Sequence, residues 1–253
     1  MKPATLSRSA LALATALLLG ASAQADEVTV AVAANFAGPL AKIAEGFTAA
    51  TGHTLKVSAG ATGKFYSQVV AGAPFEVLIA ADDETPKRLA AEGHAVAGTN
   101  FTYAIGKLVL WSARPGFVDH QGAVLASDKV KHVAIANPKV APYGAAAMEV
   151  IKARGLSDAV TPKLVTAESI AQAYQFVATG NAELGFVALS QVAVPGKPTP
   201  GSYWAVPANL YGEIRQDAVL LKAGADNPVA KALLDYLKSE AAKKLIREFG
   251  YGL

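Results

Sequence analysis

The Gly-Lys pair Gly63-Lys64, within the segment SAGATGKFYSQ (residues 58–68), resembles the end of a nucleotide-binding P-loop. A P-loop has the pattern G-x-x-x-x-G-K-[ST], in which the first glycine allows the turn and the final hydroxyl holds a magnesium ion. Here Ser58 stands at the first-glycine position and Phe65 follows the lysine, so both diagnostic ends are missing. What remains is a glycine-rich turn leading into a helix, whose free N–H groups and positive dipole end can bind an anion.

Three more predicted helix starts could contribute to the same kind of site. Asn35, Tyr143 and Ile170 each lie at the start of a helical pattern that follows a segment with strand character, as Thr62 does. In an open α/β sheet, ligands bind beyond the carboxyl ends of the strands, so these helix starts are expected to converge. Uncharged helix N-termini gathered in this way favour an oxyanion as ligand. The alternative for Thr62 is that it only caps its helix, as threonine often does.

The sequence offers few residues arranged for catalysis or metal binding. It has no cysteine, no G-x-S-x-G elbow and no H-E-x-x-H helix. The histidines show no metal-ligand spacing and are interpreted as surface or boundary residues: His53, His94, His120 and His132. The acidic run Asp82-Asp83-Glu84 is most simply explained by helix capping and the helix dipole, with a cation site as the alternative.

Strands and helices are expected to alternate along the chain. Short runs rich in apolar residues predict strands, and apolar residues at helical spacing follow most of them. The predicted strands are residues 28–33, 54–57, 75–81, 103–111, 133–136, 184–189 and 217–222. Helical patterns include residues 145–154 and 228–249, and a Pro/Gly-rich surface loop is expected at residues 194–202. This alternation predicts an α/β fold with doubly wound sheets, divided into two lobes.

The N-terminal residues have the pattern of a secretory signal peptide. Lys2 and Arg8 precede an apolar run at residues 11–19. The segment ends in Ala23-Gln24-Ala25, an A-x-A site, so cleavage is expected after Ala25. The apolar run is shorter than the roughly 20 residues of a membrane span. Loss of Lys2 and Arg8 lowers the formal net charge from +3 to +1, which gives no indication of nucleic-acid or membrane binding. We therefore expect a periplasmic protein.

Five segments, taken in chain order, resemble one protein family. They are VAVAANFAGPLAKIAEGF, GATGKFYSQVVAGAPFEVLIAADDETPKRL, FTYAIGKLVLWS, IANPKVAPYGAAAMEVI and ELGFVAL. Together they are similar to the periplasmic molybdate-binding proteins of molybdate ABC transporters, the ModA family. The resemblance implies a two-lobe type II periplasmic binding protein, with lobe I at residues 26–105 and 207–253 and lobe II at residues 106–206. It also implies a monomer that is not an enzyme, needs no cofactor and delivers molybdate or tungstate to an inner-membrane ABC permease with its cytoplasmic ATPase.

The same resemblance implies which residues hold the oxyanion. They are Ala34, Asn35, Thr62, Tyr143 and Ile170. The Asn35 amide can donate where the family often has a hydroxyl, and a backbone N–H is expected to serve at Ile170. Many members carry a tyrosine ligand at the position of Ala188, which cannot replace it. Tyr143 is expected to supply the phenol from the other side of the cleft, as in a subgroup with Asn and Tyr at these positions.

The expected site contains no Lys, Arg, Asp or Glu and no direct ligand for a metal ion. Charge-assisted hydrogen bonds and helix termini would compensate a dianion. A protonated oxyanion such as hydrogen phosphate would bring a donor with no acceptor, so fully deprotonated dianions are favoured. Lys64 is expected to point into solvent or to steer anions inward. Two alternatives remain open: the same fold binding sulfate or phosphate, and a secreted metal-dependent phosphoesterase that uses Asp82-Asp83-Glu84.

Overall fold

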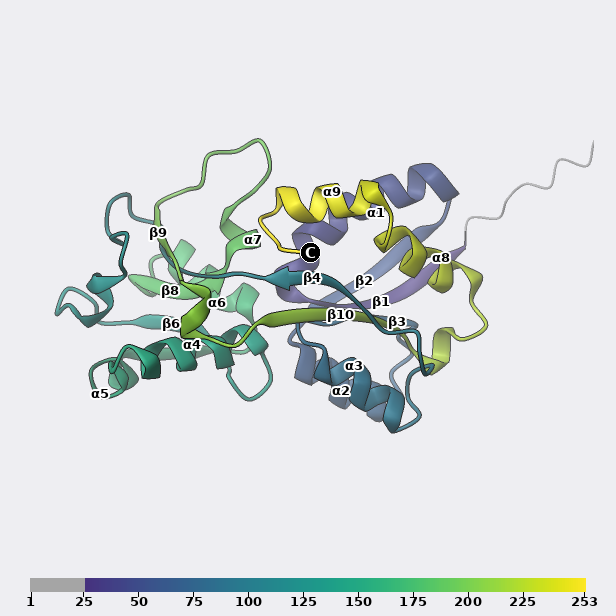
Figure 1. Ribbon diagram of the computed structural model, residues 1–253, viewed down its shortest axis with the longest axis horizontal. Helices are drawn as coiled ribbons and strands as arrows, with labels where there is room; N and C mark the ends of the chain where they lie inside the picture. Colours follow the sequence, from purple (N-terminus) through teal and green to yellow (C-terminus); the bar gives the residue numbers. More distant parts are fainter. Residues whose placement is uncertain (1–25) are drawn as a thin grey trace, which may run out of the picture.

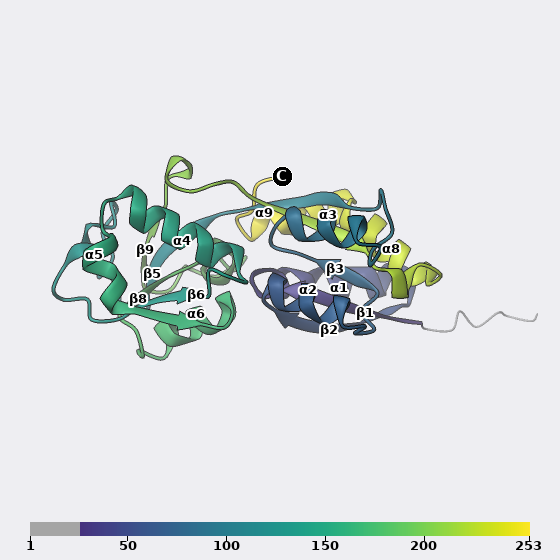
Figure 2. The ribbon, with the colours of Figure 1, turned by 90° about the horizontal axis from the view of Figure 1, so that it is seen from below.

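A computed structural model describes residues 26–253, which form two five-stranded sheets with helices on their faces (Figure 1). The predicted signal peptide and its cleavage site lie outside the described residues. The two sheets and their helices form two halves that lie side by side along the long axis of the molecule (Figure 2). Within residues 26–253, no helix combines the length and the apolar character needed to cross a bilayer.

The first sheet has the strand order β2-β1-β3-β10-β4. Its strands are β1 (Glu27–Ala33), β2 (Thr54–Gly60), β3 (Val77–Ile79), β4 (Phe101–Gly106) and β10 (Ile214–Leu220). β1 pairs in parallel with β2 and β3, whereas β10 runs antiparallel to β3 and β4. One face is covered by α1 (Ala37–Thr51), α8 (Pro228–Leu237) and α9 (Glu240–Glu248), and the other by α2 (Thr62–Val70) and α3 (Glu84–Ala91) (Figure 1).

The second sheet has the order β7-β6-β8-β5-β9. Its strands are β5 (Leu108–Ser112), β6 (Val133–Ala136), β7 (Leu164–Ala167), β8 (Leu184–Ala188) and β9 (Ser202–Ala205). The helices of this half are α4 (Pro142–Ala153), α5 (Ser157–Val160), α6 (Ile170–Ala178) and α7 (Leu189–Val192). The parallel strands β6, β7 and β8 are extended on one side by the antiparallel strands β5 and β9. Each half therefore combines a parallel βα series with antiparallel strands, and the predicted α/β fold with two lobes is confirmed.

Three predicted elements differ from the structure. The strand expected at residues 103–111 is divided at Lys107 into β4 and β5, which belong to different sheets. The helical region expected at residues 228–249 is interrupted before Ser239, which caps α9 by accepting a hydrogen bond from the backbone N–H of Ala242. The strand expected at residues 75–81 is shorter, since β3 covers Val77–Ile79, with further backbone bonds at Glu76 and Ala80 on either side.

The chain passes twice between the sheets. It leaves the first sheet between β4 and β5 and returns between β9 and β10, across residues 206–213. The first sheet thus uses strands within residues 27–106 and 214–220, and the second uses strands within residues 108–205. The boundaries predicted for the lobes, at 105/106 and 206/207, remain predictions.

Candidate functional site

A small cavity lies between the two halves and has a volume of about 10 Å³. Its walls come from the segments that follow β1, β2 and β3 in the first half, and from the starts of α4 and α6 in the second. The lining residues are Ala33, Ala34, Asn35, Gly60, Ala61, Thr62, Ala81, Ala141, Pro142, Tyr143 and Ile170. The structure therefore brings together all five residues that the sequence singled out: Ala34, Asn35, Thr62, Tyr143 and Ile170.

The size of the cavity limits what it can hold in this closed conformation. Pockets for larger organic ligands commonly occupy about 300 to 1,000 Å³, far more than the 10 Å³ found here. A nucleotide is excluded on this ground, in agreement with the missing P-loop residues around Gly63-Lys64. Only a compact solute surrounded by the helix starts can occupy the site.

Thr62 is the first residue of α2, and its side chain is almost fully buried. Ala61, not Thr62, occupies the cap position, so the alternative that Thr62 only caps its helix is wrong. The Thr62 hydroxyl accepts a hydrogen bond from the backbone N–H of Ala81 at 3.0 Å. Because a hydroxyl both accepts and donates, its hydrogen remains available to an acceptor in the cavity. The backbone N–H of Thr62 also has no partner within the helix.

Tyr143 lies in the first turn of α4 and is 1 % exposed. Its phenol oxygen accepts a hydrogen bond from Nε2 of Gln216 at 3.0 Å. Burial raises the pKa of Tyr143 well above its usual value, with the nearby Tyr251 phenol acting in the same direction. The phenol is therefore neutral at any physiological pH and can act as a hydrogen-bond donor.

Asn35 is buried in the short helical segment Ala34–Phe36 between β1 and α1. Its amide nitrogen donates to Oε1 of Gln216 at 2.9 Å and to the hydroxyl of Tyr251 at 3.0 Å. These two bonds use both amide hydrogens, so they do not support the expectation that the Asn35 side chain donates to an anion. Its backbone N–H, at the start of the helical segment, is the donor that remains.

Ile170 and Ala34 present only backbone groups and apolar side chains to the cavity. Ile170 is the first residue of α6, and the preceding Ser169 caps that helix by accepting a hydrogen bond from the N–H of Gln172. Ala188, where many family members are expected to carry a tyrosine, is fully buried at the end of β8 and does not line the cavity. Ala188 and Tyr143 both belong to the second half, so the expectation that Tyr143 supplies the phenol from the other side of the cleft is wrong. Its N–H donates to Oε1 of Gln191, whose Nε2 donates to the carbonyl of Ile170.

None of the residues that line the cavity is a Lys, Arg, His, Asp or Glu. Lys64 lies outside the cavity and pairs with Glu168, with 2.6 Å between Nζ and Oε2. The hydrogen bond from Lys64 lowers the pKa of Glu168. This ion pair joins α2 of the first half to the segment before α6 of the second, so Lys64 has a partner across the cleft and does not point freely into solvent.

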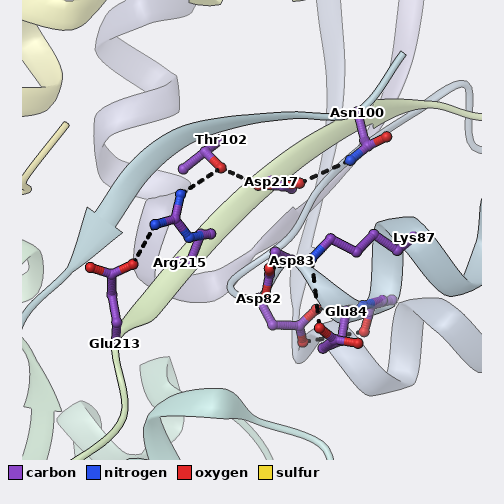
Figure 3. Close-up of polar contacts among 10 residues, drawn as sticks. Asp82, Asp83, Glu84, Lys87, Asn100, Thr102, Glu213, Arg215 and Asp217 are labelled. Atoms are coloured by element: carbon purple, nitrogen blue, oxygen red, sulfur yellow. Dashed lines mark hydrogen bonds and ion pairs between the residues drawn. The ribbon is translucent and has the colours of Figure 1, made fainter. Parts of the chain in front are cut away.

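The acidic residues at the start of α3 are held by their neighbours (Figure 3). Asp82 accepts a hydrogen bond from the backbone N–H of Thr85 at 2.8 Å, and burial raises its pKa. Lys87 pairs with Asp83 at 2.5 Å and lies 3.6 Å from Glu84. Among residues 26–253, no group of three or more His, Cys, Asp or Glu is arranged to hold a metal ion. Capping and ion pairing therefore account for the acidic run, and the phosphoesterase alternative loses its candidate centre.

Three buried polar residues beside the cavity were not identified from the sequence. Gln216 bonds to both Asn35 and Tyr143, as described above. The Tyr251 hydroxyl donates to the carbonyl of Asn35 and lies 2.9 Å from Oγ of Ser190, which also donates to that carbonyl. The three residues belong to β10, to the C-terminal segment and to α7, so only the tertiary fold brings them together.

Comparison with known proteins gives consistent matches over the whole described chain. The family model for bacterial extracellular solute-binding proteins matches residues 28–252. The molybdate-binding protein ModA of Azotobacter vinelandii is 61 % identical over 249 residues, covering 98 % of each chain. ModA of Rhodobacter capsulatus is 55 % identical, covering 98 % of this chain and 97 % of the relative.

Solved structures agree with these sequence matches. The structure of an Azotobacter vinelandii periplasmic molybdate-binding protein has a TM-score of 0.87 at 44 % identity, and the match covers 89 % of this chain and 99 % of that one. The sulfate-binding protein SubI of Mycobacterium tuberculosis has a TM-score of 0.69 at 14 % identity, covering 89 % of this chain and 86 % of that one, which shows the shared fold alone.

Proposed function

The chain belongs to the bacterial extracellular solute-binding proteins and, within them, to the ModA family, and on this premise we propose that the cavity between its halves captures molybdate or tungstate. It is a periplasmic binding protein of an ABC transporter and not an enzyme. The finer assignments are part of the proposal. They are a monomeric state, removal of the signal peptide after Ala25, and delivery of the anion to a permease that works with a cytoplasmic ATPase.

The observation that carries the proposal is a buried cavity lined by hydrogen-bond donors and by no charged side chain. The hydroxyls of Thr62 and Tyr143 each accept a bond from the protein, which leaves their hydrogens for a ligand. The first backbone N–H groups of α2, α4 and α6 are those of Thr62, Tyr143 and Ile170, since Pro142 at the start of α4 carries none, and they have no partner within their helices. Hydrogen bonds to a charged acceptor are about twice as strong as neutral ones, and helix dipoles add to them. Such a site supports a compact dianion without a counterion.

The same donor set supports selection by protonation state. No carboxylate lines the cavity, so a protonated oxyanion would place its own O–H against donors. Burying a donor without a partner costs about 1 to 3 kcal/mol. Molybdate and tungstate carry no such hydrogen at neutral pH, whereas phosphate does. Sulfate is also a full dianion, so its exclusion must come from the fit of the cavity walls.

Contacts across the cleft support capture by closure of the two halves. The backbone N–H of Gly63 in α2 donates to the carbonyl of Val140 at 2.9 Å. A side chain at Gly63 would meet the Val140 backbone at 3.0 Å, so glycine permits this approach. Lys64 and Glu168 form an ion pair beside it. An anion can reach the cavity only when these contacts separate, and closing them again encloses the anion.

Parallel calorimetric titrations with molybdate, tungstate, sulfate and phosphate test the proposal. We expect molybdate and tungstate to bind at one site per chain, with sulfate and phosphate much weaker. A preference for sulfate or phosphate would refute the ligand assignment while keeping the fold. Turnover of a phosphate monoester with a divalent metal, in the absence of molybdate binding, would refute the transport function.

A further inference from the structure

Gln216 is a fully buried amide at the centre of the polar network beside the cavity. It lies on β10, where the pairing register with β4 shifts between Gln216 and Asp217. Neighbours on a strand face opposite sides of the sheet, and both Gln216 and Asp217 are buried because helices cover both faces of the first sheet. The Asp217 carboxylate is turned away to Asn100 and Thr102 (Figure 3). Gln216 faces the cavity network, as its bonds to Asn35 and Tyr143 show.

The contacts of Gln216 fix which end of its amide faces Tyr143. Its Oε1 accepts a hydrogen bond from Nδ2 of Asn35 at 2.9 Å. The same oxygen lies 2.9 Å from the Tyr103 hydroxyl, whose single hydrogen also has the Ala80 carbonyl within 2.8 Å. With the carbonyl end held by the Asn35 amide, the NH₂ end is directed to the phenol oxygen of Tyr143 at 3.0 Å. The Tyr143 oxygen therefore accepts from the protein, and its own hydrogen is left for an acceptor in the cavity or for the neighbouring Tyr251 hydroxyl.

We propose that Gln216 is a positioning residue that directs the Tyr143 hydroxyl hydrogen into the cavity, and so makes the phenol a donor to a fully deprotonated oxyanion. The inference rests on the proposed function, because it assigns Tyr143 as a donor to the bound anion. Gln216 itself does not line the cavity and acts through Tyr143. An acceptor in place of the Gln216 NH₂ group would take the phenol hydrogen and turn the Tyr143 lone pairs toward the anion.

The backbone beside this pair is shaped to leave room for it. A Cβ atom at Gly106, which lies at the end of β4 opposite Ile214, would overlap the Tyr143 hydroxyl and would lie 2.5 Å from Nε2 of Gln216. Glycine is therefore required at this point for the two side chains to meet. Because Gln216 belongs to the first sheet and Tyr143 to α4 of the second half, the bond forms only when the halves are brought together.

Gln216→Glu is the most informative variant, because it keeps the shape and replaces the NH₂ donor by a carboxylate oxygen. At about pH 8 the carboxylate accepts the phenol hydrogen, and we expect molybdate affinity to fall about 10- to 100-fold or more, the worth of a hydrogen bond to a charged partner. A buried carboxyl group has a raised pKa. On lowering the pH to about 5.5, the protonated acid again donates to Tyr143, and affinity should recover toward that of the wild type.

Controls separate this effect from the other charges nearby. The groups that face Gln216 are the neutral phenols of Tyr103 on β4, Tyr143 on α4 and Tyr251 in the C-terminal segment, with the carboxylates of Asp82 and Asp217 beyond them. All are present in the wild type, so its pH profile, measured in parallel, accounts for them. Gln175→Glu, at an exposed position of α6, adds the same charge remote from the site and should leave binding unchanged.

A double-mutant cycle tests whether Gln216 acts through Tyr143. Gln216→Met removes the donor without adding charge and should weaken binding about 3- to 30-fold in the wild-type background, less than a charged partner would. In the Tyr143→Phe background it should have almost no further effect on affinity, because the hydrogen that it positions is absent. This cycle also serves if Gln216→Glu does not fold.

Each result decides the inference. Recovery of Gln216→Glu affinity at low pH, with coupling between Gln216→Met and Tyr143→Phe, supports it. Wild-type affinity of Gln216→Glu at pH 8, equal weakening at both pH values in a folded protein, or additive effects in the cycle would overturn it. Molybdate binding by the wild type in those cases leaves the proposed function intact, whereas a wild type that binds no molybdate refutes both.

Discussion

The hydroxyl of Thr62 accepts a hydrogen bond from the backbone N–H of Ala81 at 3.0 Å, and both residues line the cavity between the two halves. This bond joins the first turn of α2 to the segment that follows β3. It occupies an acceptor site of the hydroxyl and therefore leaves the hydrogen as the group presented to a ligand. The oxygen of Thr62 thus stabilises the fold, while the hydrogen of the same hydroxyl is available to bind a ligand.

Thr62→Val keeps the shape of the side chain and removes the hydroxyl. Affinity for the oxyanion should fall by about 1.5 to 3 kcal/mol, the range for a hydrogen bond to a charged group. Stability should also fall, by about 1 to 3 kcal/mol, because the N–H of Ala81 is left buried without its partner. Calorimetry and urea denaturation measure the two effects. Thr62→Ser retains the hydroxyl and is the control; equal losses in both variants would show that the hydroxyl is not a ligand.

Tyr143→Phe removes the buried phenol that takes the place of the tyrosine that many family members are expected to carry at the position of Ala188. We predict a loss of about 1.5 to 3 kcal/mol in oxyanion affinity with little change in closure, because the ring remains packed. Tyr203→Phe, at a partly exposed position of β9, is the matched control and should bind as the wild type does. An unchanged affinity of Tyr143→Phe in calorimetric titrations would exclude the phenol from the ligand set.

The cleft residues were accessible to sequence reasoning because helix starts after parallel strands are local features. Thr62, Tyr143 and Ile170 each stand in the first turn of a helix that follows a short apolar run, and the family resemblance selected the same positions. The lobes themselves were predicted as an alternation of strands and helices. The sequence pattern predicts these positions correctly because each of them lies where one helix begins, close in sequence to the strand before it.

Other features depend on contacts that no local pattern reveals. The apolar run through Lys107 predicted one strand, because hydrophobic spacing does not tell which sheet a residue joins. Gln216 carries no motif, and its partners Asn35 and Tyr143 lie 181 and 73 residues away in sequence. The Asn35 amide was assigned to the ligand by its type, whereas the network that occupies its hydrogens forms only in the folded chain.

We expect the Lys64–Glu168 ion pair to stabilise the closed arrangement of the two halves without contacting the anion. Both side chains are substantially exposed, at 46 % and 75 %, and exposed pairs contribute little. Lys64→Met is therefore expected to weaken binding less than about fivefold, mainly through faster dissociation, and the difference from the wild type should shrink at high salt. Stopped-flow dissociation rates measure this. Lys42→Met, which breaks the Lys42–Glu45 pair within α1, is the control; a far larger loss in Lys64→Met would place the ammonium in contact with the anion.

Three buried phenols make the protein sensitive to high pH. Burial raises the pKa values of Tyr103 and Tyr143 well above the ordinary value of 10, and raises that of Tyr251. Above about pH 10 the unfolded chain loses these protons while the folded chain keeps them, so folding stability is full below pH 10 and falls as the pH rises. Each phenol contributes a slope of up to about 1.4 kcal/mol per pH unit.

Urea denaturation between pH 9 and about pH 12 checks this expectation. Tyr103→Phe should show a shallower loss than the wild type, since one of the three phenols is removed and the lysines are unchanged. The absorbance of tyrosinate, followed in the folded protein, gives a second readout. Ionisation of all tyrosines near pH 10 without unfolding would contradict the burial of these groups.

The most direct measurement is a calorimetric titration of the wild-type protein with molybdate, carried out alone and in a large excess of sulfate. The account predicts one molybdate per chain with nearly the same affinity in both titrations, because it assigns the exclusion of sulfate to the fit of the cavity walls. Loss of the molybdate signal in sulfate, or no binding in either titration, would contradict it.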